Sequence, residues 1–226
     1  QLASKVREKT MSMIVNRRDL DFVLYEALDL NSILESEHYA DYDRESLDAM
    51  LDLCQSLAED RFLPFAAKLD ANEPKFVDGK VETIPEVKEA INAFREAGLC
   101  TSAYDANIGG MQLPWMMDQA LNGMFVCANN PVHTYLFLTQ GVANMLNACG
   151  SDELKAKYLP KLVEGEWFGT MCLSETQAGS SLADIRTKAD LRADGAYNIS
   201  GTKMWISGGE QDITDNIVHM VLAKIP

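Results

Sequence analysis

Two short segments in the last third of the chain combine small, hydroxyl-bearing and aromatic residues in a way that could bind a flat, anionic ligand. Residues 171–182 (Met-Cys-Leu-Ser-Glu-Thr-Gln-Ala-Gly-Ser-Ser-Leu) leave a strand-like stretch and enter a loop of very small residues. Backbone N–H groups of such a loop can approach an anion closely. Residues 203–209 (Lys-Met-Trp-Ile-Ser-Gly-Gly) add an indole, a hydroxyl and two glycines. Together the segments offer the apolar wall and polar rim that a heteroaromatic ligand needs.

Each segment alone also fits an ordinary structural role, because small-residue loops are usually turns and a Trp in a strand usually lies in the core. The motifs of a serine hydrolase and of a Rossmann nucleotide-binding site are both absent from the sequence. Ser207 precedes two glycines, but position 205 is Trp, so the G-x-S-x-G elbow of hydrolases is absent. Neither Gly109-Gly110 nor Gly208-Gly209 extends to the G-x-G-x-x-G of a Rossmann nucleotide site.

The composition narrows the class of protein further. The chain has 226 residues, 47% of them hydrophobic, with a net charge of −14 from 34 acidic and 20 basic residues. An acidic surface repels phosphate backbones and anionic lipid, so we expect neither nucleic acid nor a membrane as a partner. The five cysteines and three histidines are scattered. This pattern predicts no metal site, and free buried thiols in a reducing compartment, which favours a cytoplasmic protein.

The first two thirds of the sequence predict helices. Asp43 can cap a segment whose apolar residues repeat at helical spacing from Leu47 to Phe62, and Pro64 should bend or stop this helix. Residues 71–81 are polar and contain a proline and an Asp-Gly pair, so we expect a loop. The remaining expectations are a helix from Pro85 to Gly98, an exposed connection at 101–113, two largely buried antiparallel helices broken at 129–131, a helix at 152–158 capped by Ser151, and a short helix restarted by Pro160.

The periodicity changes at Trp167, and the residues after it predict antiparallel β structure. Strands are expected at 168–173, 185–192, 196–200, 202–206 and 216–224, with a two-residue hairpin turn at Asp194-Gly195. A sheet that stops at Pro226 would keep an open edge, which natural domains avoid. We therefore expect the β domain to be incomplete in this chain.

Three ordered motifs resemble the acyl-CoA dehydrogenase family. Residues 173–181 (Leu-Ser-Glu-Thr-Gln-Ala-Gly-Ser-Ser) resemble its Thr/Ser-Glu-Pro-x-Ala-Gly-Ser-Asp string, with Thr176 in place of Pro and Ser181 in place of Asp. Residues 201–207 (Gly-Thr-Lys-Met-Trp-Ile-Ser) resemble its second flavin segment, Gly-x-Lys-x-Trp/Phe-Ile-Thr/Ser. Residues 157–166 match its lead-in, and Gly109-Gly110 stands where the family has a Tyr-Gly-Gly turn.

The resemblance implies a fold and a domain organisation. The fold would be α+β, with an N-terminal all-helical domain followed by the first half of an antiparallel β-barrel domain, and with the C-terminal helical domain absent. The domains would be an N-terminal extension at 1–40, the helical domain at 41–166 and a partial β domain at 167–226. Residues 1–10 lack an initiator Met and are interpreted as an expression remnant or a processed start. The extension and residues 208–214 are similar to the larger bacterial members, the group that includes 3-methylmercaptopropionyl-CoA dehydrogenases.

The resemblance also implies FAD as the cofactor and assigns contacts to it. Leu173 and Ser174 would contact the pyrimidine side of the isoalloxazine, and Gly179 and Ser180 the pyrophosphate, with Ser180 also near the acyl-CoA substrate. The remaining implied flavin contacts are Met171 at the ring, where the family often has an aromatic residue, Trp205 and Ile206 along the flavin face, and Ser207 near N5.

The activity implied is α,β-dehydrogenation of an acyl-CoA thioester, an oxidoreductase reaction of fatty acid metabolism. In this family a Glu removes the α-proton. It lies in the C-terminal domain, so we expect no catalytic residue in this chain and a fragment that is inactive by itself. Family membership also implies an electron-transfer flavoprotein as acceptor and a homodimer or homotetramer at full length. The alternatives are an AidB-like, DNA-associated flavoprotein, which needs a basic surface, and a non-catalytic helical scaffold.

Overall fold

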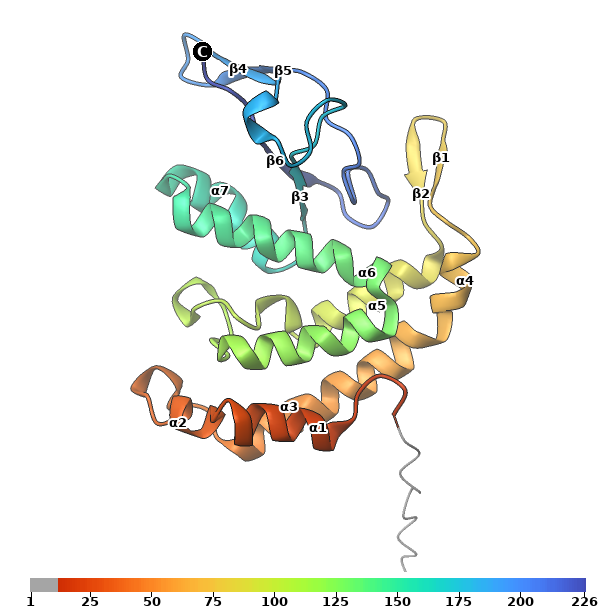
Figure 1. The fold of residues 1–226 in the computed structure, drawn as a ribbon, viewed down its shortest axis with the longest axis vertical. Helices are drawn as coiled ribbons and strands as arrows, with labels where there is room; N and C mark the ends of the chain where they lie inside the picture. Colours follow the sequence, from red (N-terminus) through yellow and green to blue (C-terminus); the bar gives the residue numbers. More distant parts are fainter. Residues whose placement is uncertain (1–11) are drawn as a thin grey trace, which may run out of the picture. The chain divides into compact units, whose positions relative to one another are not determined.

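The computed structural model of the chain describes residues 12–226, so the interpretation of residues 1–10 lies outside the described residues. The predicted α+β class is confirmed, because helices occupy most of the chain up to Val163 and short strands come after it (Figure 1). The chain divides into two compact units. One contains the described residues up to Ala71 together with Thr101–His133, and the other contains Asn72–Cys100 together with Thr134–Pro226. The domain boundaries expected at 40/41 and 166/167 stay a prediction.

The helices of the first unit follow the predicted pattern. Asp43 caps α3 through a capping box with Ser46, whose backbone N–H donates to Asp43 Oδ1 at 2.8 Å. Leu47, Leu51 and Cys54 of this helix are fully buried. The helical elements of this unit are α1 (Arg17–Asp21), η1 (Phe22–Ala27), α2 (Leu30–Leu34), η2 (Glu37–Tyr39), α3 (Arg44–Leu57), η3 (Ala58–Phe62), η4 (Leu63–Phe65), α4 (Ala66–Asp70), η6 (Ala106–Ile108) and the first part of α6 (Trp115–Cys149).

The bend expected at Pro64 is spread over two irregular turns. The π-helical turn η3 and the 3₁₀ turn η4 come between α3 and α4, and Pro64 lies in the first turn of η4. A proline has no N–H to donate, so it is tolerated where a helical segment starts afresh. The chain therefore stays helical through Pro64 while its hydrogen-bonding pattern changes.

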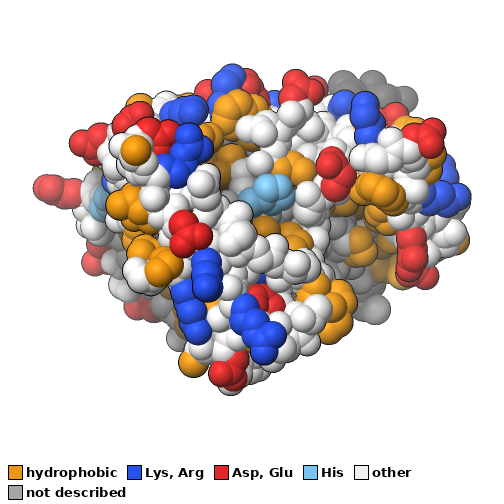
Figure 2. Space-filling view, turned by 90° about the horizontal axis from the view of Figure 1, so that it is seen from above, with side chains coloured by type: hydrophobic (Ala, Val, Ile, Leu, Met, Phe, Trp, Pro, Cys, Tyr) orange, Lys and Arg blue, Asp and Glu red, His pale blue; other side chains and the backbone are white. Residues whose placement is uncertain are grey.

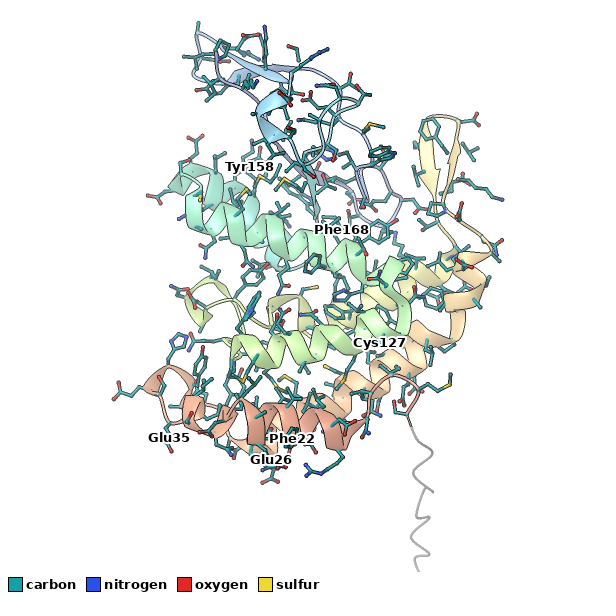
Figure 3. All side chains as sticks on the ribbon, viewed as in Figure 1. Phe22, Glu26, Glu35, Cys127, Tyr158 and Phe168 are labelled. Atoms are coloured by element: carbon teal, nitrogen blue, oxygen red, sulfur yellow. The ribbon has the colours of Figure 1, made fainter. Side chains whose placement is uncertain are left out.

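The N-terminal segment packs on α3 through polar contacts. The Tyr25 hydroxyl donates to Asp48 at 2.8 Å, and the Arg44 guanidinium lies 4.0 Å from the centre of the Tyr25 ring. Phe22 and Glu26, labelled in Figure 3, belong to the turn that carries Tyr25, and 49% of the Phe22 surface is exposed. These contacts hold the segment against α3 within the first unit.

The connection at 101–113 is less exposed than expected. Ser102, Tyr104 and Leu113 are buried. Backbone hydrogen bonds fold the segment onto itself, and a Cβ added to Gly110 would lie 1.8 Å from the Tyr104 carbonyl oxygen. The predicted turn at Gly109-Gly110 thus forms, with Gly109 at φ 85°. The turn is so tightly packed that only a residue without a side chain fits at position 110.

The break predicted at residues 129–131 is confirmed. Helix α6 contains one residue with non-helical angles, Asn129 (φ −162°, ψ 81°), two positions before Pro131. Proline lacks the N–H that an uninterrupted helix would use at this position, and its ring clashes with the carbonyl four residues earlier, so the helix breaks just before Pro131. The Asn129 side chain donates to the Phe62 carbonyl at 3.1 Å, which satisfies a polar group in a buried place.

In the second unit, the prediction of a loop at residues 71–81 is wrong in part. Strands β1 (Lys75–Val77) and β2 (Lys80–Glu82) pair as an antiparallel hairpin. Its two turn residues, Asp78 and Gly79, both have positive φ (49° and 85°). Asp-Gly is a favoured pair for this tight hairpin turn, so the signal was present in the sequence. The next helix, α5 (Pro85–Glu96), begins as predicted, and Gly98 lies just beyond it at φ 75°.

Helix α7 (Asp152–Val163) corrects a second expectation. Ser151 caps it as predicted, accepting a hydrogen bond from the Leu154 N–H at 3.3 Å. Pro160 lies inside this helix and does not restart a new one. Leu159, Leu162 and Val163 around it are buried, and this burial offsets the lost helical hydrogen bond.

The β segment contains fewer and shorter strands than expected. Strands β3 (Phe168–Cys172) and β6 (Ile217–Val221) pair in parallel, so the antiparallel prediction is wrong for this pair. Strands β4 (Lys188–Leu191) and β5 (Tyr197–Ser200) form the predicted antiparallel hairpin. The Arg192 N–H donates to the Ala196 carbonyl, so the loop has three residues, with Gly195 at φ 82°, where two were expected. Residues 202–206 form no strand, because Trp205 has a positive φ of 57°.

Two general features complete the fold. The prediction of buried thiols is correct for Cys54 and Cys172, but Cys127 and Cys149 are exposed and Cys100 is intermediate. Over residues 12–226, no helix is both long enough and apolar enough to cross a membrane.

Candidate functional site

Strand β3 fixes the start of the first candidate segment. Gly169 packs so closely against α6 that an added Cβ would lie 2.6 Å from Val142 Cβ, and its N–H donates to Thr139 Oγ1 at 3.0 Å. Phe168, labelled in Figure 3, stacks on Tyr135 with ring centres 5.9 Å apart. These contacts anchor the start of the strand on α6, and Met171 keeps 38% of its surface exposed.

A tight turn comes after the strand. The Ala178 N–H donates to the Glu175 carbonyl at 3.1 Å, and the Glu175 N–H donates to the Ala178 carbonyl at 2.8 Å. Neither Thr176 nor Gln177, at the two central positions, has a positive φ. This combination is typical of a type I turn. Beyond it, Gly179, Ser180 and Ser181 are exposed.

The Glu175 side chain is buried beneath this turn and accepts five hydrogen bonds. Its Oε1 accepts from the Thr187 N–H (3.0 Å), the Thr187 hydroxyl (2.6 Å) and Lys203 Nζ (2.9 Å). Its Oε2 accepts from the Arg186 N–H (2.7 Å) and Gln177 Nε2 (2.6 Å). Hydrogen bonds from Thr187, together with those from Arg186 and Lys203, hold the pKa of the Glu175 carboxyl well below its usual range.

Lys203 joins the two candidate segments. Its ammonium donates to the Leu173 carbonyl at 3.0 Å as well as to Glu175, and only 9% of its side chain is exposed. The next residue, Met204, donates its N–H to the Ser174 carbonyl at 3.0 Å. Three hydrogen bonds therefore connect residues 173–175 with residues 203–204.

Gly201 allows this arrangement by having no side chain. Its φ is 151°, and an added Cβ would lie 2.4 Å from Thr187 Oγ1 and 2.8 Å from Thr187 Cα. A larger residue would displace the hydroxyl that donates to Glu175. The Gly and Lys of this segment thus have a structural explanation in the same buried network.

The second segment continues into an exposed turn. Trp205 combines a left-handed backbone (φ 57°) with 84% exposure, an unusual state for so large an apolar residue. Gly208 has a φ of 65°, and an added Cβ there would lie 3.1 Å from Tyr135 Cδ1. Further along, Asp212 accepts hydrogen bonds from the Thr83 hydroxyl (2.7 Å) and the Thr83 N–H (3.2 Å). The turn is therefore fixed on both sides while the indole is left free.

The eight residues predicted to bind the cofactor have three kinds of environment. Met171 and Trp205 present exposed apolar surface, and Leu173, Ser174 and Ile206 are half-buried around the joined segments. Gly179, Ser180 and Ser207 are exposed. The hydrogen bonds of the first and second segments bring Leu173 and Ser174 close to Met204, the neighbour of Trp205. Whether these residues bind FAD stays a prediction.

The donor set of the site fits an anionic, heteroaromatic group. Within the described residues, the N–H groups of Gly179 and Ser180 and the hydroxyls of Ser174 and Ser207 have no hydrogen-bond partner. Such groups suit a pyrophosphate and the polar edge of a flavin, and the exposed Trp205 indole suits its ring face. The residues of this site are therefore compatible with FAD.

The sequence did not identify all the residues that build the site. Thr187 and Arg186 lie outside both motifs, twelve and eleven residues after Glu175, and no local pattern marks them as its donors. Thr170, within β3, was also not identified; its hydroxyl lies 2.6 Å from Nδ1 of His219 on the neighbouring strand. In the part of the chain that the structure describes, no group of three or more His, Cys, Asp or Glu side chains could hold a metal ion.

The comparisons with known proteins agree with the motifs. The family described as "Acyl-CoA dehydrogenase, N-terminal domain" matches residues 44–166, more than half of the chain. A butyryl-CoA dehydrogenase of Syntrophomonas wolfei is 36% identical over 216 residues, which cover 92% of this chain and 35% of the relative. A 3-methylmercaptopropionyl-CoA dehydrogenase of Ruegeria pomeroyi is 33% identical over 209 residues, with 92% and 36% covered.

Solved structures support the same fold. An acyl-CoA dehydrogenase of Bacillus anthracis complexed with FAD superposes with a TM-score of 0.66 at 24% identity, over 82% of this chain and 30% of that one. The chain spans about 35% of the length of the curated relatives it matches. From the ordered motifs, the matched domain and the shared fold, it follows that the chain belongs to the acyl-CoA dehydrogenase family.

Proposed function

We propose that this chain forms part of an FAD-dependent acyl-CoA dehydrogenase, an oxidoreductase that acts on CH–CH groups and introduces an α,β double bond into an acyl-CoA thioester of fatty acid metabolism. The observation that carries the proposal is the pair of family-like segments at 171–181 and 201–207, joined by Lys203 and Met204 next to an exposed Trp205. Family membership makes this chemistry the first expectation for such a site.

Met171, Leu173, Ser174, Gly179, Ser180, Trp205, Ile206 and Ser207 are the residues proposed to hold FAD. When bound, FAD supplies the acceptor for the hydride that leaves the β-carbon. The N–H groups of Gly179 and Ser180, which have no hydrogen-bond partner among residues 12–226, are suited to the pyrophosphate, and Ser180 is also suited to the entering thioester. The Trp205 indole would cover one face of the ring and exclude water from it.

We propose that the catalytic base comes from outside these residues. Glu175 is the carboxylate of the first motif, but its two oxygens already accept five hydrogen bonds. Its pKa is held well below the usual range by donors led by Thr187. A base needs a free lone pair and a pKa near the working pH, and Glu175 has neither. We therefore do not assign the base to Glu175, and we propose that the chain by itself is inactive.

The proposed partners follow from the same assignment. The substrate is an acyl-CoA, the electron acceptor is an electron-transfer flavoprotein, the complete protein is a homodimer or homotetramer, and its compartment is the cytoplasm. The view in Figure 2 shows acidic as well as basic side chains, and the net charge of the sequence is −14. This charge distribution favours a dehydrogenase over a DNA-associated member of the family.

The product of the complete gene provides the test. Purified under native conditions, it is expected to be yellow, to contain FAD, and to lose its visible flavin absorbance when an acyl-CoA is added without oxygen. A protein that is colourless and takes up no FAD on reconstitution would contradict the proposal. Retention on DNA at low salt that is lost at high salt would support the DNA-associated alternative.

A further inference from the structure

The Glu175 carboxylate is a buried group that accepts five hydrogen bonds and that the proposed chemistry does not use. The Glu175 side chain is 3% exposed, and each of its two oxygens faces only donors. A neutral amide in this place would direct its NH2 group at either the Arg186 N–H or the Thr187 N–H, and two donors cannot bond each other. The site therefore requires an ionised carboxylate.

This carboxylate lies where the two candidate flavin segments meet. Glu175 belongs to the turn of the first segment, and Lys203 belongs to the second, two residues before Trp205. Thr187, at the edge of β4, supplies two of the five donors and packs against Gly201. The network thus ties three separate parts of the chain to one side chain.

We propose that Glu175, Lys203 and Thr187 are positioning residues, an inference that rests on the proposed function. They hold residues 171–174 and residues 205–207 at the separation that a flavin requires. Glu175 and Thr187 are buried and only 9% of the Lys203 side chain is exposed, so the three side chains act through the segments they connect and do not touch the ligand. The network sets the place of Trp205 through Lys203, because the Lys203 ammonium also holds the Leu173 carbonyl.

The mechanism is preorganisation of a binding site. Without the network, the Trp205 turn would keep one backbone hydrogen bond to the first segment, from Met204 to Ser174. The indole would then sample several positions, and the flavin would have to order it on binding. That ordering cost appears as weaker binding without any change in the groups that touch the ligand.

Three variants of the complete gene product separate these contributions. Lys203→Met removes the cation and both of its hydrogen bonds, and Glu175→Gln removes the charge. Thr187→Val removes one hydroxyl donor, keeps the N–H bond and conserves the shape. The matched control is Lys161→Met, because Lys161 forms an ion pair with Glu166 in the same unit, but with both side chains about two-fifths exposed.

The measurement is the Kd for FAD, titrated well below the unfolding temperature, together with the visible circular dichroism of the bound flavin. Lys203→Met and Glu175→Gln are expected to weaken FAD binding about tenfold or more, which corresponds to about 1.4 kcal/mol. Thr187→Val should weaken it about three- to tenfold, as expected for one hydrogen bond. The flavin dichroism should change in all three, the double variant Glu175→Gln/Lys203→Met should be less than additive, and Lys161→Met should match the wild type.

Each outcome decides the inference. Variants that unfold at lower temperature but keep the wild-type Kd and flavin dichroism would show a purely structural role and overturn it. If Lys203→Met and Glu175→Gln do not fold, Thr187→Val alone decides, since an unchanged Kd in a folded Thr187→Val protein also overturns it. A wild-type protein that binds no FAD would refute the proposed function, and the inference with it, whereas FAD binding with insensitive variants refutes the inference alone.

Discussion

Replacing Trp205 by glycine should leave the stability of the chain almost unchanged while weakening the flavin site. The side chain is 84% exposed, so about a sixth of it is buried. A fully buried aromatic side chain covers up to about 250 Å². The buried part is therefore about 40 Å², which is worth about 1 kcal/mol at 25 cal/mol per Å².

The backbone at this position acts in the opposite direction. Trp205 has a φ of 57°, in the left-handed region. This conformation costs a residue with a side chain about 1–2 kcal/mol, and glycine adopts it freely. Glycine also gives the unfolded chain more freedom, which costs about 0.5–1 kcal/mol. The three contributions nearly cancel, so the free energy of unfolding of Trp205→Gly should lie within about 1 kcal/mol of the wild type.

Two assays check the reasoning. Thermal unfolding of the 226-residue chain, followed by far-UV circular dichroism, should show a Tm shift of less than about 4 °C for Trp205→Gly. In the product of the complete gene, FAD should bind about 5- to 150-fold more weakly, because stacking on an aromatic side chain is worth about 1–3 kcal/mol. Trp115→Ala is the matched control, since this second Trp is 57% exposed but lies outside the candidate site, and its FAD affinity should not change.

Either measurement can refute this expectation. A loss of about 3 kcal/mol or more in Trp205→Gly would mean that the indole is packed in the chain and not held free. An unchanged FAD affinity in a stable Trp205→Gly protein would mean that the exposed indole is not part of the flavin site.

Three further predictions concern the framework of the two units. Burial lowers the pKa of His133 to about 4, so the unfolded state takes up a proton first as the pH falls below about 6.5, and about 3 kcal/mol of stability should be lost through this group between pH 6.5 and pH 4. Urea unfolding across this range should show a loss about 3 kcal/mol larger in the wild type than in His133→Asn, whose remaining loss comes from carboxylates with lowered pKa such as Glu175. Gly110→Ala places a Cβ 1.8 Å from the Tyr104 carbonyl oxygen and should lower the free energy of unfolding in urea by at least about 1–3 kcal/mol. An unchanged free energy of unfolding would contradict the tight turn. Thr176→Pro should raise the free energy of unfolding by about 0.4–1 kcal/mol, because position 176 is the second residue of a type I turn and its N–H makes no backbone hydrogen bond within residues 12–226. A loss of stability would refute the turn assignment.

The sequence predicts the helical part of this protein well because its signals there are local. A capping residue such as Asp43 or Ser151 acts on backbone groups three residues away, and both helix starts are confirmed. The break before Pro131 is likewise a property of neighbouring residues. The missed hairpin at residues 75–82 also had a local signal, since Asp78-Gly79 is a turn pair, but the polar composition around it favoured a loop.

The β part is harder to predict because its structure depends on distant partners. Trp and Ile favour strands, yet residues 202–206 follow the hydrogen bonds of Lys203 and Met204 to the first segment and do not pair as a strand. The parallel pairing of β3 with β6 joins residues about fifty positions apart, such as Thr170 and His219, and no local pattern encodes it. For the same reason Thr187 could not be recognised as a donor to Glu175.

The two motifs divide into residues that build the site and residues left free to meet a ligand. Glu175, Lys203 and Gly201 belong to the buried network or allow it to form, so their identities are determined by hydrogen bonds and close packing within the chain. The two departures from the family pattern, Thr176 and Ser181, are both exposed and lie outside that network. A threonine can occupy the turn position that proline favours, and a serine beyond the turn alters only what the loop presents to solvent or to a ligand. The departures therefore leave the hydrogen-bonded framework of the site intact. Thr176 should cost the turn a small part of its stability, whereas Ser181 should change ligand affinity before it changes folding.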